Sequence, residues 1–205
     1  MDQTPSRQEA ATKPRKPTRR QIERCAQVLD AAEACFVELG FHGASMAMIA
    51  KRADMSIGHI YHYFANKDAI VEAVVSRDFE PQRQTVESLR TLTADALRAK
   101  LLARAVEAVR TRADPFRSVL NLEIHAECQR NARVAKIVRQ QEDALRAAFV
   151  EMLSDTLGLP DAEGRVEILF ALFAGLPIRA MRNPEQNEAE LAQVVGQTLD
   201  RWLSP

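Results

Sequence analysis

The sequence predicts an all-α protein of about nine to ten helices. From Gln21 onward, apolar residues recur at three- to four-residue spacing almost to the end of the chain, which is the period of an amphipathic helix. The chain of 205 residues contains only seven glycines. No segment alternates β-branched and polar residues for long enough to indicate a strand. Helices are therefore the only regular elements that we expect.

The N-terminal segment, residues 1–18, is predicted to be a disordered basic arm. It carries three prolines and few residues that a core could bury. Six cationic residues lie within twelve positions around its end, opposed only by Glu23: Lys13, Arg15, Lys16, Arg19, Arg20 and Arg24. The formal net charge of the whole chain is zero, but residues 1–67 carry ten Lys and Arg against seven Asp and Glu. A basic segment beside a folded unit is typical of proteins that bind a phosphate backbone.

Four helices are predicted before Pro81. The first spans residues 19–39 and ends at Gly40, because glycine readily adopts the left-handed conformation found at helix ends. Ser45, Ser56 and Asn66 each stand directly before an apolar periodic run, where a side-chain oxygen can accept a hydrogen bond from a free backbone amide. These caps give the next three helices the ranges 46–53, 57–64 and 67–79.

Six further helices are predicted beyond Pro81. They are separated by turn-forming residues such as Asp114-Pro115, Gly158-Leu159-Pro160 and Asn183-Pro184. Their expected ranges are 83–91, 94–112, 115–129, 132–157, 162–181 and 187–203. We therefore expect a small N-terminal domain, residues 19–67, followed by a larger helical domain, residues 68–205.

The small domain has the arrangement of a helix-turn-helix unit, which presents its second helix to the major groove of DNA. Two short capped helices are joined by the turn Ala53-Asp54-Met55-Ser56. The apolar side of the second helix can pack inward, whereas Gly58, His59 and His62 point outward. Glycine at this place lets the backbone come close to a phosphate group. The pattern indicates a DNA-binding head.

This part of the sequence resembles the DNA-binding head of the TetR (tetracycline-repressor) family of bacterial regulators. The resemblance rests on the gap-free stretch 49–67 and on positions on either side of it. The matching positions are Ala31, Ala32, Phe36, Gly40, Phe41, Ser45, Ile49, Ala50, Ala53, Ser56, Gly58, Ile60, Tyr61, Tyr63, Phe64, Lys67 and Ile70. The resemblance implies a repressor that binds a palindromic operator as a homodimer and releases it when a small-molecule effector binds.

The resemblance also implies roles for individual residues. Ser45, Tyr61, Tyr63 and Lys67 correspond to phosphate contacts, which position the head on the duplex. Gly58, His59 and His62 face the floor of the groove, with Met46 and Ile57 near its edge. The whole set of expected DNA-binding residues is Ser45, Met46, Ser56, Ile57, Gly58, His59, Tyr61, His62, Tyr63 and Lys67. The basic arm would add contacts to the phosphates or the minor groove.

Two positions depart from the family pattern. The glycine usual in the turn is Asp54, which enters the left-handed region at a higher cost. The position after Gly58 usually holds a small or hydroxyl-bearing residue, but here it is His59, whose ring nitrogens can reach a base edge. The operators of other members are therefore not expected to be the operator of this chain.

For the larger domain, the resemblance implies a ligand cavity and a dimer interface. Apolar stripes on the last two helices would meet their symmetry mates in a four-helix bundle, whereas packing inside one subunit could also cover both stripes. The stripes are Val166, Leu169, Phe170, Phe173, Leu176 and Pro177, and Leu191, Val194, Val195, Thr198, Leu199 and Trp202. The expected lining of a cavity for an apolar or amphipathic effector is Phe116, Leu120, Ile124, His125, Cys128, Phe149, Met152 and Phe170. Core packing without a ligand would place the same residues inside, so both interpretations stay open.

Other kinds of site are not expected. His59 and His62 have no cysteine or carboxylate at ligand spacing beside them, so no metal site is predicted. The chain has no nucleotide-binding glycine loop and no nucleophile motif, and His125 with Cys128 lacks an orienting third group. We therefore predict neither an enzyme nor a cofactor. Cys128 as a redox sensor would need a resolving thiol, and a plain buried cysteine is the alternative.

The expected setting is the bacterial cytoplasm, with association to the nucleoid when bound to DNA. The three cysteines have no disulfide spacing, and the N-terminus has no apolar stretch of a signal peptide. No apolar run approaches the roughly 20 residues that span a bilayer, so no membrane partner is expected. One alternative function stays open: a helical module that binds a small molecule or a protein and whose head does not read DNA.

Overall fold

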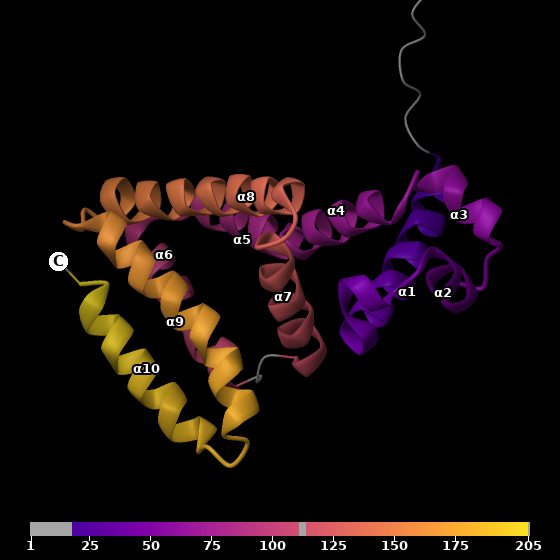
Figure 1. Ribbon diagram of the computed structural model, residues 1–205. Coiled ribbons are helices and arrows are strands. Elements are labelled where there is room, and N and C mark those ends of the chain that lie inside the picture. Colours follow the sequence, from indigo (N-terminus) through magenta and orange to yellow (C-terminus); the bar gives the residue numbers. More distant parts are fainter. Residues whose placement is uncertain (1–17, 111–113, 205) are drawn as a thin grey trace, which may run out of the picture.

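The computed structural model describes residues 18–110 and 114–204, and within these ranges the protein is built from helices without a strand (Figure 1). The prediction of an all-α fold is confirmed. The expected arm lies, apart from Thr18, outside the described residues.

The N-terminal head consists of α1 (Arg19–Gly43), α2 (Met46–Arg52) and α3 (Ile57–Tyr63). Helices as short as α2 and α3 are not stable alone in water, so caps and packing must hold them. Ser45 and Ser56 accept hydrogen bonds from the third residue after them, as the sequence predicted. The side chains that fill the space between the three helices are fully buried and include Phe36, Ile49 and Ile60.

The first helix is broken near its end by Gly40, which has a left-handed φ of 70°. A short helical segment follows the break, and in it the ring of Phe41 packs on Phe36 with 4.4 Å between centroids. A Cβ atom at position 40 would lie 3.2 Å from Oε2 of Glu123 on α7. Glycine is needed here for its backbone freedom, and a larger residue would also require the Glu123 carboxylate to shift slightly.

Two helices, α4 (Lys67–Asp78) and α5 (Glu80–Arg90), lead out of the head into the larger domain. Pro81 was expected to interrupt the helix, and α5 was expected to begin at residue 83. Instead, Pro81 lies in the first turn of α5. A proline is tolerated there because the amides of the first turn have no partner within the helix.

The larger domain continues with α6 (Ala94–Arg110), α7 (Pro115–Cys128), α8 (Ala132–Glu151), α9 (Ala162–Arg182) and α10 (Glu188–Trp202). In Figure 1, α8 runs alongside α4 and α5, and α7 descends between the head and the rest of the domain. Helix α10 packs chiefly against α6. These ranges lie close to the predicted ones.

The predicted helix 132–157 changes form after Glu151. A π-helical turn, Met152–Thr156, follows α8 and is closed by a 3.1 Å hydrogen bond from Leu157 N to Met152 O. The wider turn buries both Met152 and Leu153, which belong to different apolar clusters. The spacing of apolar residues does not reveal such a local widening of the helix, because it shifts the register by a single residue.

The core of the head continues into the larger domain. Val28 and Phe36 of α1 belong to the same buried cluster as Leu120 and Ile124 of α7. A second large cluster lies among α6, α9 and α10. Because the first cluster crosses the boundary between the domains, a displacement of α7 must disturb the packing of the head.

Candidate DNA-binding head and ligand cavity

The turn between α2 and α3 has the left-handed residue that the sequence indicated. Asp54 has a φ of 50°, and Met55 N donates to Ala50 O at 3.0 Å. The side-chain amide of Gln27 on α1 donates to Ala53 O at 2.7 Å, which ties the turn to the longest helix of the head. These bonds set the angle at which α3 leaves α2.

The outer face of α3 is exposed and polar. Ile57 and Tyr61 are 46% and 50% exposed, and a Cβ added to Gly58 would meet no atom within 4 Å. His59 and His62 are also exposed. Ile60 is fully buried on the opposite side. This helix has the division into an inner and an outer face that a groove-binding helix requires.

An aromatic cluster covers the C-terminal part of that face. The ring of Tyr63 lies with its centroid 5.3 Å from that of His59 and 5.2 Å from that of His62. The hydroxyl of Tyr63 is 3.4 Å from Nε2 of His59, at the long end of hydrogen-bond distances. The contact restricts the imidazole of His59 before any DNA is bound.

The two predicted serine contacts are already engaged as caps. Ser45 Oγ accepts from Met48 N at 3.3 Å, and Ser56 Oγ accepts from His59 N at 3.2 Å. A hydroxyl that accepts can still donate its own proton to a phosphate oxygen. Met46 is half-buried against the core of the head, so most of its side chain faces inward.

The ammonium group of Lys67 is not free at the surface but is bound to backbone carbonyl groups. Its ammonium group donates to Phe41 O at 2.7 Å and to Ala44 O at 3.1 Å, and the side chain is half-buried. Lys67 therefore ties α4 to the segment between α1 and α2. Two of its three protons are used in this way, and a phosphate contact through the third stays a prediction.

The larger domain contains a cavity of about 860 Å³, whose walls come from the end of α4 and from α5 to α10. Its apolar surface includes Phe79, Phe149, Phe170 and Phe173. The rings of Phe149 and Phe170 meet edge to face, at 85° and with 5.7 Å between centroids. A cavity of this size and lining suits a drug-sized amphipathic molecule.

Three of the eight residues predicted to line a cavity do so, namely His125, Phe149 and Phe170. The other five do not line this cavity: Phe116, Leu120, Ile124, Cys128 and Met152. Leu120 and Ile124 are buried because the apolar stripe of α7 packs against the head. Met152 is buried against Leu89 and Leu97 instead. The contributions of α5 and α6 to the cavity could not be predicted, since nothing in their periodicity identifies a cavity.

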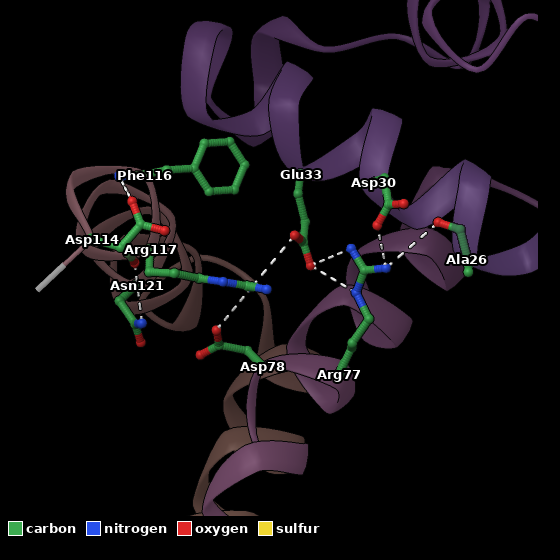
Figure 2. A network of polar contacts seen from close by, with 9 residues as sticks. All are labelled: Ala26, Asp30, Glu33, Arg77, Asp78, Asp114, Phe116, Arg117 and Asn121. Carbon is green, nitrogen blue, oxygen red and sulfur yellow. Dashed lines mark hydrogen bonds and ion pairs between the residues drawn. The ribbon is translucent and has the colours of Figure 1, made fainter.

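The head and the larger domain are joined by a network of ion pairs that centres on Glu33 of α1 (Figure 2). The carboxylate of Glu33 is 5% exposed and lies between two guanidinium groups. Arg77 of α4 is 2.6 Å from it, and Arg117 of α7 is 3.4 Å from it. Arg77 also pairs with Asp30 at 2.7 Å, and Arg117 pairs with Asp78 at 3.5 Å.

Asp78, at the end of α4, belongs both to this network and to the cavity wall. Burial raises the pKa of its carboxyl group above the usual value. The nearby Arg117 opposes this rise, while Glu33 adds to it. A buried carboxylate with one long ion pair is sensitive to any further cation or hydrogen-bond donor that comes near it.

The apolar stripes of α9 and α10 are only partly available to a partner. Val166, Leu169, Val195 and Leu199 are buried within the subunit, contrary to their expected place in an interface between subunits. The exposed apolar residues of these helices are Ile168, Met181 and Val194, at 61%, 39% and 52%. The apolar periodicity predicted where the helices lie. It could not predict which part of each apolar stripe is covered within the subunit itself.

Within residues 18–110 and 114–204, no group of three or more His, Cys, Asp and Glu side chains is placed to hold a metal ion. Burial raises the pKa of the Cys128 thiol, which disfavours the reactive thiolate. None of the described helices is both long and apolar enough to cross a bilayer.

Comparison with known proteins agrees with this arrangement. The family model "Bacterial regulatory proteins, tetR family" matches residues 28–74, and "Tetracyclin repressor-like, C-terminal domain" matches residues 92–204. The transcriptional regulator UidR of Escherichia coli K12 is 31% identical over 133 residues, 63% of this chain and 64% of its own length. BetI of Burkholderia mallei is 36% identical over 84 residues, 41% of this chain and 43% of its own. The chain thus covers less than two thirds of each of these relatives.

Solved structures give the same result over more of the chain. Salmonella enterica GusR superimposes with a TM-score of 0.71 at 29% identity, over 89% of this chain and 94% of that one. A TetR-family regulator from Mesorhizobium loti shares the fold with a TM-score of 0.74 at 20% identity, over 91% and 98%. Both domains are matched in the order in which they occur here. The chain belongs to the tetR family of bacterial regulatory proteins.

Proposed function

We propose that the protein is a ligand-responsive transcriptional regulator that binds a palindromic operator as a homodimer and is released by a small-molecule effector. The observation that carries the proposal is the outer face of α3, which is exposed and polar and has open space over Gly58. Such a face has no function in packing. It fits the floor of a major groove, where base edges are read.

Selection of binding sites from random duplex DNA with the purified chain tests this function. Enrichment of a palindrome with half-sites about one helical turn apart is the expected result, because two heads related by two-fold symmetry read the same sequence on both strands. The absence of any enriched sequence would favour the alternative of a helical module that does not read DNA.

Gly58→Ala should separate the stability of the head from its affinity for DNA. The added methyl group meets no protein atom, and alanine favours a helix by up to about 1 kcal/mol relative to glycine. We therefore expect unchanged or slightly higher resistance to urea, together with weaker binding to the selected duplex in an anisotropy titration. Unimpaired binding would mean that α3 does not approach DNA closely at this residue.

His59→Ala should lower affinity for the selected operator by about 1–3 kcal/mol and affect random duplex much less, since a base contact carries sequence information and a phosphate contact does not. Competition titrations with the two duplexes measure both losses. Tyr63→Phe is the comparison variant, because it removes the hydroxyl of an expected phosphate contact beside Nε2 but keeps the ring, and it should weaken binding to both duplexes alike. Equal losses of His59→Ala on both duplexes would assign the histidine to the backbone.

The effector site in this proposal is the cavity of the larger domain. The fold is shared with FadR from Bacillus subtilis, a structure of which is in complex with stearoyl-CoA, at a TM-score of 0.64 and 21% identity. Binding of the effector and of DNA must oppose each other by the same factor, because coupling between two sites is reciprocal. We propose that α4 transmits the effect of effector binding to the head, because it begins at Lys67 in the head and ends at Asp78 in the cavity wall.

A further inference from the structure

The cavity of the larger domain has an excess of negative charge. Its lining includes four carboxylates, Asp78, Glu142, Asp143 and Glu167, but only two guanidinium groups, Arg104 and Arg146. Arg146 is engaged by Glu167 at 2.6 Å and by Glu163 at 3.5 Å. The other guanidinium, of Arg104, donates to Thr85 Oγ1 at 2.7 Å.

Two of these carboxylates are not balanced by a cation among the residues that the structure describes. In the described part of the chain, neither Glu142 nor Asp143 makes an ion pair, and both are exposed on α8 at the cavity. Asp78 is 8% exposed, and its ion pair with Arg117 is long, at 3.5 Å. Burial raises the pKa of its carboxyl group, and the side chains of Asn121 and His125 also act to lower it. A ligand that carries a positive charge would therefore meet attraction at the rim and at the wall.

We infer that the effector is a cationic amphiphile whose charged group pairs with Asp78 while its apolar part lies against the phenylalanine-rich wall. This inference rests on the proposed effector role of the cavity, and it adds the chemical class of the ligand and the residue that receives it. Asn121 and His125 of α7 line the same cavity beside Asp78 and add polar groups to that wall.

The pairing explains how ligand binding in the cavity can change the position of the head. In this proposal the charged group of the ligand displaces Arg117 from Asp78, whose ion pair with Arg117 is the longest of the network at 3.5 Å. Arg117 also contacts Glu33, which is buried in α1 and shared with Arg77 of α4. Loss of the Arg117–Asp78 pair thus loosens the attachment of α7 to α1 and α4, the helices that set the position of the head.

Calorimetric titration of the full chain with three ligands of equal chain length, decylammonium, decanol and decanoate, below their micelle concentrations tests the class. We expect decylammonium to bind about tenfold or more tighter than decanoate, since one charge-assisted hydrogen bond contributes that much to binding. Equal or tighter binding of decanoate, or no binding of decylammonium, overturns the inference.

Three variants, each of which removes one charge, test the residue. Asp78→Asn should weaken decylammonium binding about tenfold, whereas Asp143→Asn, the matched change of an exposed cavity carboxylate, should alter it less than about threefold. Arg117→Gln should tighten it, because the competitor for Asp78 is removed. A general loss of structure cannot produce changes of opposite sign. Equal effects of Asp78→Asn and Asp143→Asn, or weaker binding in Arg117→Gln, would assign the cation to another place.

Amide hydrogen exchange of the same samples tests the link to the head. Decylammonium should speed amide exchange in α1 and α4 of the wild type. The Asp78→Asn variant should show faster exchange in the same two helices even without a ligand. Unchanged exchange in both cases overturns the coupling. No arm of these experiments uses DNA, so failure of the chain to bind an operator and failure of this inference give different results.

Discussion

Replacement of Ile168 and Val194 by glutamate is expected to convert a dimer of the protein into monomers. The two side chains are 61% and 52% exposed on α9 and α10, so the change leaves the core of the subunit intact. In the proposed dimer it places four carboxylates in apolar contact, each at a cost of about 1–3 kcal/mol. The dissociation constant of the dimer should therefore rise by a factor of about a thousand or more.

Sedimentation equilibrium over a range of concentrations measures this change. The control is the double variant Ile22→Glu and Leu122→Glu, which alters two apolar residues of comparable exposure, 57% and 44%, on α1 and α7. The control should keep the association state of the wild type. If the first variant also remained a dimer, the proposed interface through α9 and α10 would have to lie elsewhere. Val195 and Leu199 are unsuitable for this test, because both lie in the subunit's own core.

Arg77→Met is expected to lower the free energy of unfolding by about 3–5 kcal/mol, the usual consequence of removing one partner of a buried ion pair. Glu33 is 5% exposed and would lose its nearest cation, at 2.6 Å, and keep only Arg117 at 3.4 Å. Methionine retains the length of the aliphatic stem, so the loss of charge and hydrogen bonds dominates over the loss of packing.

Urea unfolding followed by circular dichroism measures the difference. Arg52→Met is the matched control, because Arg52 pairs with Glu38 at the similar distance of 2.7 Å but at the surface, where both side chains are more than a third exposed. We expect little change from the control, since water and salt screen exposed pairs. Equal, small effects of both variants would mean that water reaches Glu33 and that the network does not stabilise the head.

The sequence alone predicted those features that depend on near neighbours in the chain. The caps Ser45 and Ser56 accept the expected hydrogen bonds, and Asn66 Oδ1 accepts from Ala69 N at 2.8 Å. Asp54 adopts the left-handed conformation that the turn requires. Helix limits, turn and inward face of α3 follow from such contacts, because the interacting groups are three or four residues apart. The resemblance to the family added the DNA-binding role of the head.

Only the tertiary structure decided what each buried face packs against. Leu120 and Ile124 share the periodicity of cavity residues, but they lie in the core of the head. Lys67 binds two carbonyl groups more than twenty residues away in the sequence, and Glu33 meets partners from α4 and α7. An amphipathic pattern indicates that one side of a helix is shielded from water. A protein core, a ligand cavity and a second subunit can each shield that side equally well. The choice among them depends on contacts between distant segments, which local spacing does not contain.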